Sequence, residues 1–199
     1  MDIKKIVNFI FEMSQLKRKT SGWSLAGLPA AGSASIAEHT LRAAQIGYIL
    51  AVMENVNPEK VASMLIIHDI AEARIGDQHK VAARYYSNKE PSRQAFREQI
   101  ENLGTTVEEK WQKYFQEFTD RNTKEGIVAR DADWLEMAFQ AKEYKEQGYS
   151  STQNWIDNVS KAVETESAKK LLTEMEKTSS TNWWKNLKKM TYKKLDQNK

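Results

Sequence analysis

Apolar residues recur at helical spacing along almost the whole chain, and this pattern restricts the possible fold more than any other feature. At the start of the chain, Ile3, Ile6, Val7, Ile10 and Met13 fall on one face of a helix. No long segment alternates apolar and polar residues as a half-buried strand would. Only eight glycines and three prolines occur, so hairpin turns are scarce. The sequence therefore predicts an all-α, multi-helical fold.

Local end signals divide this pattern into separate helices. Ser35 and Glu38 form a capping-box motif that predicts a helix from residue 36 to about residue 55. Asn57 and Pro58 predict the start of the next helix, which we expect to run to about residue 74, before Gly76. Further helices are expected over residues 91–104, from residue 105, over residues 122–148, and over residues 150–177.

The composition bounds the class of protein. A chain of 199 residues with 40% hydrophobic and 29% charged residues is typical of a globular protein with one main domain. The absence of cysteine excludes disulfides, thiolate zinc sites and a cysteine nucleophile. The net charge of +3 is too small to indicate nucleic-acid binding, and no apolar run approaches the ~20 residues of a membrane span. We expect a cytoplasmic protein, because charged residues interrupt the N-terminal apolar segment.

Residues 178–199 differ in character from the preceding domain, which we place at residues 1–177. They hold a basic, amphipathic segment in which Trp183 and Trp184 are followed by several lysines. We expect a final helix that docks its two tryptophans on the domain or on a second subunit. Binding to a membrane surface or to nucleic acid is the alternative, because basic helices with aromatic residues suit both.

Two of the three histidines lie on stretches that are otherwise apolar. His68 is followed directly by Asp69 within the run LIIHDI. A carboxylate buried there needs a partner, and a bound metal ion is one solution. His39 lies in the first turn of the preceding helix, and two antiparallel helices joined by a short turn bring it near His68. Two core histidines with Asp69 as a local cap or ion-pair partner are the other interpretation, but the combination of all three residues favours a metal site.

Two further carboxylates follow at short spacing. Glu72 lies four residues after His68 and three after Asp69, so it shares a helix face with both. Asp77 comes directly after Gly76, where the chain leaves the predicted helix. Two carboxylates beside a metal ion suit general acid and base catalysis. A solvated Glu72 and a turn residue at Asp77 are the structural alternatives.

These motifs carry a resemblance to a known family. The segments SIAEHT, IIHDIAEARIGD and DADWLEMAFQAKEY resemble the HD-domain phosphohydrolase superfamily, and within it the small 5′-deoxynucleotidase-like HD proteins. The resemblance covers about residues 1–177. It implies that His39, His68 and Asp69 are metal ligands, together with an aspartate on the late long helix. It also implies catalytic roles for Glu72 and Asp77.

Two aspartates compete for the role of the fourth ligand. Helical periodicity places Asp131 on the apolar stripe of its helix, together with Val128 and Leu135. The family pattern instead matches Ala132 to Met137 and indicates Asp133, in a register fixed by the flanking match through Gln140, Glu143 and Tyr144. We therefore expect Asp133 to bind the metal. Asp131 is the second choice, with an ion-pairing role as the structural interpretation.

The resemblance also implies residues that hold the substrate. Trp23 occupies the position at which the relatives use a tryptophan to hold the nucleotide, although a core role is equally compatible with the sequence. Gly22 stands directly before Trp23, and Arg18 or Lys19, slightly earlier in the chain, is the candidate for the basic residue that the relatives use. Lys80, which follows Asp77, is a further candidate for binding phosphate. Each of these bases has an ordinary surface role as its alternative.

The resemblance and the donor set together predict a chemistry. Two imidazoles and two carboxylates suit one divalent ion such as Mn²⁺, Co²⁺, Fe²⁺, Zn²⁺ or Mg²⁺. The expected reaction is hydrolysis of (deoxy)ribonucleoside 5′-monophosphates to nucleoside and phosphate, by a homodimer as in the relatives. The alternatives are a phosphodiesterase or triphosphohydrolase acting on other nucleotides, and a non-catalytic helical binding module that contains a metal ion.

Overall fold

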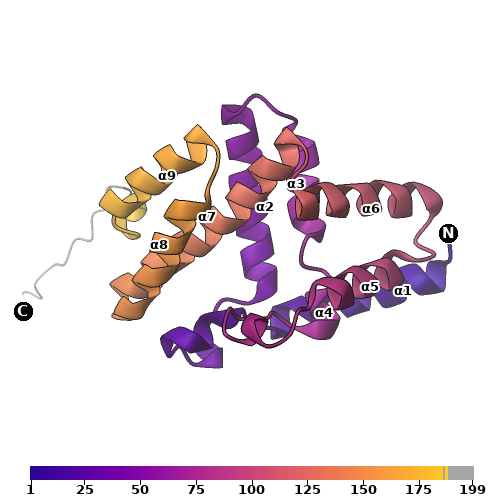
Figure 1. Ribbon diagram of the computed structural model, residues 1–199. Coiled ribbons are helices and arrows are strands. Elements are labelled where there is room, and N and C mark those ends of the chain that lie inside the picture. The colour runs from indigo at the N-terminus through magenta and orange to yellow at the C-terminus, as the bar shows by residue number, and fades with distance from the viewer. Residues whose placement is uncertain (186, 188–199) are drawn as a thin grey trace, which may run out of the picture.

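A computed structural model describes residues 1–185 and residue 187 (Figure 1). Its α-helices are α1 (Ile3–Met13), α2 (Ile36–Met53), α3 (Pro58–Ile67), α4 (Glu72–Ile75), α5 (Lys89–Ile100), α6 (Thr105–Asp120), α7 (Lys124–Glu146), α8 (Gln153–Ala162) and α9 (Glu166–Lys177). Short 3₁₀-helices and loops connect them. In the described part of the chain, β pairing is limited to one isolated bridge, between Thr20 and Ser35. The all-α prediction is therefore confirmed.

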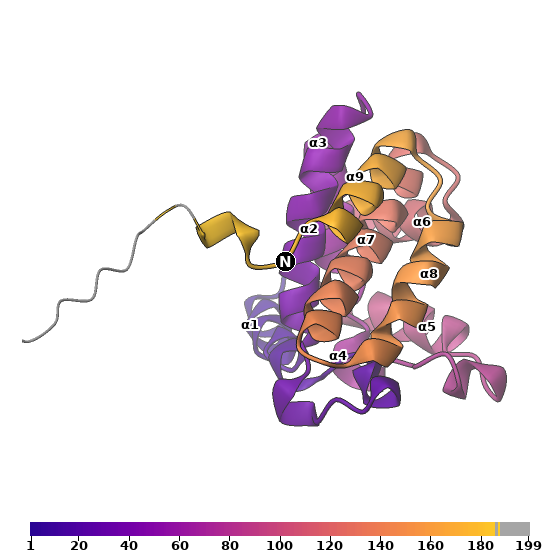
Figure 2. The same cartoon turned by 90° about the vertical axis from the view of Figure 1, so that its left-hand side faces the viewer.

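Helices α2, α3 and α7 form the centre of the molecule, and α8 and α9 pack on α7 (Figure 2). Small residues allow the central helices to approach closely. Gly47 of α2 is buried, and a Cβ atom at this position would lie 2.2 Å from Leu65 Cδ1 of α3. Ala132 of α7 lies against the same point. Larger side chains here would push the three helices apart, and these helices carry the residues of the candidate site.

A second apolar cluster joins α1, α4, α5 and α6 and also includes Ile36 of α2 and Ile67 of α3. The rings of Phe96 and Phe115 stack at its centre with a centroid distance of 4.0 Å. Polar contacts hold α1 to the same group, because Arg74 of α4 donates hydrogen bonds to Glu12 of α1. This cluster anchors α4 and therefore the chain segment that follows His68.

The helix predicted to run to about residue 74 is interrupted, so this expectation was wrong. Helix α3 ends at Ile67, and the chain makes a tight turn before α4 begins at Glu72. The turn is built from short-range hydrogen bonds such as Glu72 N–H to Asp69 C=O, at 3.0 Å. Gly76 then ends α4 with φ of 73°, a left-handed conformation that favours glycine. The apolar run continues through the turn, so periodicity alone gave no sign of the break.

The helix predicted over residues 150–177 is divided into α8 and α9, which is a second correction. The break falls at Val163–Thr165, without a glycine or proline to mark it. The side chain of Asp131 on α7 accepts hydrogen bonds from the backbone N–H groups of Glu164 and Thr165. Thr165 then caps α9. A tertiary contact therefore causes the break.

The predicted C-terminal helix falls mainly outside the described residues. In the described part, Asn182–Trp184 form a short 3₁₀-helix, and the side chains of Trp183 and Trp184 are exposed. The expected docking of the two tryptophans on their own domain is therefore not observed. Within the described residues, no helix combines the length and hydropathy that a bilayer crossing requires.

Candidate metal centre

Three separate elements bring the predicted ligands together. The capping box of Ser35 and Glu38 is formed as expected and starts α2, which places His39 in the first turn. His68 and Asp69 lie on the turn between α3 and α4. Asp133 lies in the middle of α7. We call His39, His68, Asp69 and Asp133 the metal cluster.

The donor atoms of the metal cluster converge on one point. His39 Nε2 lies 3.3 Å from His68 Nε2 and 3.1 Å from Asp133 Oδ1. Asp69 Oδ2 lies 2.9 Å from His68 Nε2 and 3.6 Å from His39 Nε2. Ligand atoms bound about 2.1 Å from a single ion lie roughly 3.0–3.4 Å from one another. The donor atoms of His39, His68 and Asp69 all lie within 4.8 Å of one another, which fits one shared metal ion, and Asp133 Oδ1 approaches the two imidazoles, at 3.7 Å from His68 Nε2.

Both histidines are held with the same ring nitrogen directed at this point. His39 Nδ1 contacts the carboxylate of Glu136, and His68 Nδ1 lies 2.6 Å from the carbonyl oxygen of Leu65. Each of these acceptors favours a proton on Nδ1 and leaves the lone pair of Nε2 available. The two Nε2 lone pairs then face each other and two carboxylates. This set of groups suits a cation bound between them.

Electrostatics give the same indication. Burial lowers the pKa of His39, but its hydrogen bonds to Asp133 and Glu136 outweigh burial and raise it well above its ordinary value. Burial likewise lowers the pKa of His68, but the charge of Asp69 and the contact with Asp133 raise it to about 9. The carboxylates thus favour positive charge at this point, which a divalent ion would supply.

Glu72 and Asp77 lie beside the metal cluster, as the motif predicted. Burial raises the pKa of Glu72 to about 10, and the charges of Asp69 and Asp77 add to the shift. Burial also raises the pKa of Asp77, with a further contribution from Asp69. Asp77 Oδ2 accepts a hydrogen bond of 2.7 Å from the backbone N–H of Gly22. The region is thus crowded with carboxylates, and Asp77 is fixed by a loop 55 residues away in sequence.

The predicted substrate-binding residues are less closely associated with the cluster. Trp23 is only 3% exposed and packs against Tyr144 and Trp155, so the packing favours its core role. Arg18 is exposed, and its guanidinium donates a hydrogen bond to the hydroxyl oxygen of Ser14. Lys80 is exposed on the loop that follows Asp77. In the described part of the chain, neither base forms a hydrogen bond or ion pair with the metal cluster.

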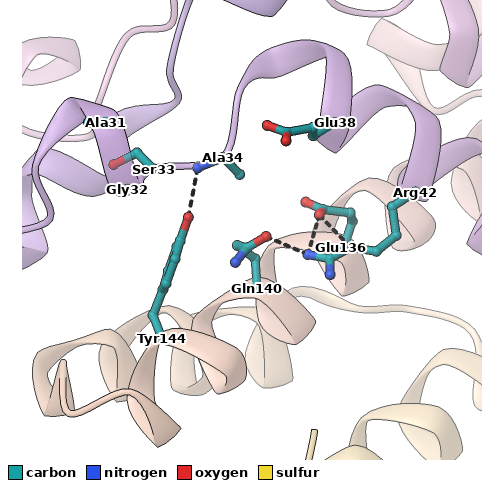
Figure 3. A pocket seen from close by; sticks show the side chains of 9 residues that line it. All are labelled: Ala31, Gly32, Ser33, Ala34, Glu38, Arg42, Glu136, Gln140 and Tyr144. Carbon is teal, nitrogen blue, oxygen red and sulfur yellow. Dashed lines mark hydrogen bonds and ion pairs between the residues drawn. The ribbon is translucent and has the colours of Figure 1, made fainter. Parts of the chain in front are cut away.

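Three charged residues at the site had no role in the sequence-based hypothesis. Glu136 contacts His39. It also accepts a hydrogen bond from Arg42, which donates to Gln140 as well (Figure 3) and to Glu143. Arg130 donates to Asp133 Oδ2 at 3.0 Å. The spacing of three residues between Arg130 and Asp133 is a sequence signal for this pair. The contact between Arg42 and Glu136 joins α2 to α7 and has no local signal.

Comparison with known proteins identifies the family. A family model described as HD domain matches residues 13–176. The chain belongs to the HD domain family. This HD domain is 28% identical over 149 residues to the 5′-deoxynucleotidase HDDC2 of Xenopus laevis, covering 72% of this chain and 71% of that protein. It is 26% identical over 141 residues to the 5′-deoxynucleotidase HDDC2 of Dictyostelium discoideum, covering 65% and 71%.

Solved structures share the architecture of this HD domain. A conserved hypothetical protein from Pyrococcus furiosus superposes with a TM-score of 0.71 and 27% identity, over 86% of this chain and 99% of that chain. A second structure, from Magnetospirillum magnetotacticum, is titled a predicted metal-dependent phosphohydrolase. It superposes with a TM-score of 0.63 and 21% identity, over 87% of this chain and 92% of that chain, and at this identity it supports the fold alone. Family membership and the metal cluster together support a metal-dependent phosphohydrolase.

Proposed function

We propose that this HD domain is a 5′-nucleotidase that hydrolyses (deoxy)ribonucleoside 5′-monophosphates to nucleoside and phosphate with one divalent metal ion. The observation that carries the proposal is the convergence of two Nε2 atoms with the carboxylates of Asp69 and Asp133. The two relatives named 5′-deoxynucleotidase supply the substrate class. Nitrogen and oxygen donors suit Mn²⁺, Co²⁺, Fe²⁺, Zn²⁺ or Mg²⁺.

The protein groups around the cluster have separate tasks. A bound ion of this kind polarises a phosphoryl oxygen and lowers the pKa of water. Asp77 is held in place by the N–H of Gly22, so its carboxylate can orient a water molecule or accept its proton. Burial and the charges of Asp69 and Asp77 raise the pKa of Glu72, which suits a carboxyl group that donates a proton to the leaving oxygen of the nucleoside.

A phosphate-release screen tests the proposal. Ribo- and deoxyribonucleoside 5′-monophosphates, 3′-monophosphates, cyclic nucleotides and triphosphates would be incubated with the protein and Mn²⁺, Co²⁺ or Mg²⁺. We expect orthophosphate from the 5′-monophosphates, with turnover lost in Asp69→Ala and retained in Asp157→Ala, a matched change at an exposed position on α8. Turnover restricted to cyclic nucleotides or triphosphates would instead support a phosphodiesterase or triphosphohydrolase. Binding of Mn²⁺ without hydrolysis of any ester would indicate a binding module.

The homodimer stays a prediction, and exposed apolar residues on two helices provide positions at which to test it. Helices α1 and α2 each expose large apolar residues. These are Ile3, Val7, Ile10 and Phe11 on α1, and Leu41, Tyr48, Ile49, Val52 and Met53 on α2. Sedimentation analysis of the wild type and of Ile49→Glu would detect a dimer and its loss. The cytoplasmic location also stays a prediction.

A further inference from the structure

The proposed substrate would bring negative charge into a centre that is already acidic. A phosphate monoester carries about two negative charges near neutral pH. The carboxylates of Asp69, Asp77 and Asp133 surround the place where it would bind. A protein cation at the edge of this place would reduce the repulsion. Among the described residues, two arginines are hydrogen-bonded at this centre, namely Arg42 and Arg130.

Arg42 is already committed to other partners. Its Nε donates to Glu136 at 2.8 Å, Nη1 donates to Glu143 at 2.8 Å, and Nη2 donates to Gln140 at 2.7 Å. It also lies behind His39, on the side of Nδ1, because Glu136 separates it from the ring. Arg42 lines the pocket of Figure 3, but three of its donors are already bound to protein acceptors.

Arg130 has a different environment. Nη1 donates to Asp133 Oδ2 at 3.0 Å, and the guanidinium lies 4.0 Å from the centre of the Phe118 ring. The Phe118 ring in turn packs against His68, with a centroid distance of 5.0 Å. Arg130 is thus held at the edge of the metal cluster by one ion pair and one aromatic face.

The guanidinium of Arg130 retains donors for a ligand. The side chain is 26% exposed, and in the described part of the chain its hydrogen bonding is limited to Asp133. A guanidinium has five N–H donors in a planar fork, which matches the oxygens of a phosphate group. Stacking on Phe118 restricts the side chain before any ligand binds, so less conformational entropy is lost on binding.

We propose that Arg130 binds the phosphate group of the substrate at the edge of the metal centre. This assignment rests on the proposed function and deepens it, because it names a protein cation that holds the phosphate beside the ion.

The test compares Arg130→Gln, Arg130→Lys and Arg121→Gln. Arg121 is a matched control, because it also lies over an aromatic ring, that of Trp134, and pairs with an acid, Glu164, away from the metal cluster. We expect Arg130→Gln to raise KM for 5′-monophosphates, and the inhibition constant of inorganic phosphate, by about 10-fold or more, since a charge-assisted hydrogen bond is lost. Arg130→Lys should recover part of both effects, and Arg121→Gln should change neither.

A second measurement separates phosphate binding from a merely structural role. Because Arg130 also donates to Asp133, Arg130→Gln can itself change the affinity for Mn²⁺, which calorimetry without substrate measures, and the inhibition constant of phosphate is therefore compared at saturating Mn²⁺. A loss of Mn²⁺ affinity with unchanged phosphate inhibition would overturn the proposal and show that Arg130 only holds Asp133. If the wild type hydrolyses no 5′-monophosphate, the proposed function fails. Calorimetry of inorganic phosphate binding to the Mn²⁺-loaded wild type and Arg130→Gln would still decide the role of Arg130, with equal affinities overturning it.

Discussion

Asp131 and Asp133 lie two residues apart on α7, yet they serve two different regions of the molecule. Asp131 is fully buried and accepts hydrogen bonds from the N–H groups of Glu164 and Thr165 and from the Thr165 hydroxyl. Asp133 faces the metal cluster on another side of the helix, since two residues turn an α-helix by about 200°. One region is the start of α9, and the other is the candidate metal centre.

The partners of the two carboxylates explain the difference. Asp131 accepts hydrogen bonds from the start of α9, which lower its pKa, but burial outweighs them and keeps the pKa above its ordinary value. Asp133 Oδ1 meets two imidazole nitrogens that are themselves oriented as acceptors by Glu136 and by the Leu65 carbonyl. Asp131 is bound by donors at the start of α9, whereas Asp133 accepts from Arg130 through Oδ2 and directs Oδ1 at the two imidazoles, where a cation can bind.

The largest expected effect comes from Asp133→Ala. Removal of one of four ligands should reduce Mn²⁺-dependent phosphate release by at least about 100-fold and abolish tight Mn²⁺ binding, because the remaining donors hold the ion less well. Phosphate release and calorimetric titration measure the two effects, and circular dichroism checks that the variant is folded. Full activity in a folded variant would contradict the assignment of Asp133 to the metal centre.

Asp131→Ala should show the reverse pattern. The N–H groups of Glu164 and Thr165 would lose their acceptor, which should lower the free energy of unfolding by about 2–3 kcal/mol. Activity per folded molecule should stay close to that of the wild type. Urea denaturation measures the loss, and Asp131→Asn, which keeps one acceptor oxygen, should lose less. If Asp131→Ala kept the stability of the wild type but lost metal binding, Asp131 and not Asp133 would be the metal ligand.

The same pair shows how far sequence could predict the site. Periodicity placed Asp131 on the buried stripe, and it is indeed fully buried, but burial does not reveal which partners a side chain meets. The family pattern indicated Asp133, which the structure brings to His39 and His68. Local signals such as the capping box before α2 were formed as expected, because they depend on residues close in sequence.

Features that depend on distant contacts could not be predicted. The break between α8 and α9 requires Asp131, which lies 33 residues before Glu164. Glu136, which contacts His39 and binds Arg42, lies on another helix and is 97 residues from His39 in sequence. Apolar residues continue through the tight turn after α3, so the sequence pattern does not distinguish a turn from a continued helix.

Glu136→Gln tests whether the loss of a group that holds His39 has a smaller effect than the loss of a metal ligand. An amide at this position cannot serve both the Nδ1–H of His39 and the guanidinium of Arg42 as a carboxylate does. We expect Mn²⁺ affinity to fall by about 10–100-fold, with kcat at saturating Mn²⁺ close to that of the wild type. Activity titrated against Mn²⁺ concentration gives both values. A fall in kcat with unchanged Mn²⁺ affinity would instead place Glu136 among the groups that contact substrate.

Glu12→Gln should have the smallest effect. It tests a carboxylate outside the site that accepts its hydrogen bonds from donors within the protein. Burial raises the pKa of Glu12, but hydrogen bonds from Arg74 and Gln99 outweigh it and hold the pKa below its ordinary value. A lowered pKa in the folded state means that the stabilisation is fully present above the ordinary pKa and is lost as the pH falls through the folded value.

The wild type should therefore lose more stability than Glu12→Gln between about pH 5 and pH 3, by about 1 kcal/mol or less, because the pair is partly exposed. Urea denaturation at several pH values measures the difference. Glu166→Gln is the control: Lys169 also lowers the pKa of Glu166, but this pair is open to solvent, and its pH dependence should match that of the wild type. Identical acid profiles for Glu12→Gln and the wild type would show that donors around a partly exposed carboxylate, unlike those around Asp131, do not stabilise this fold.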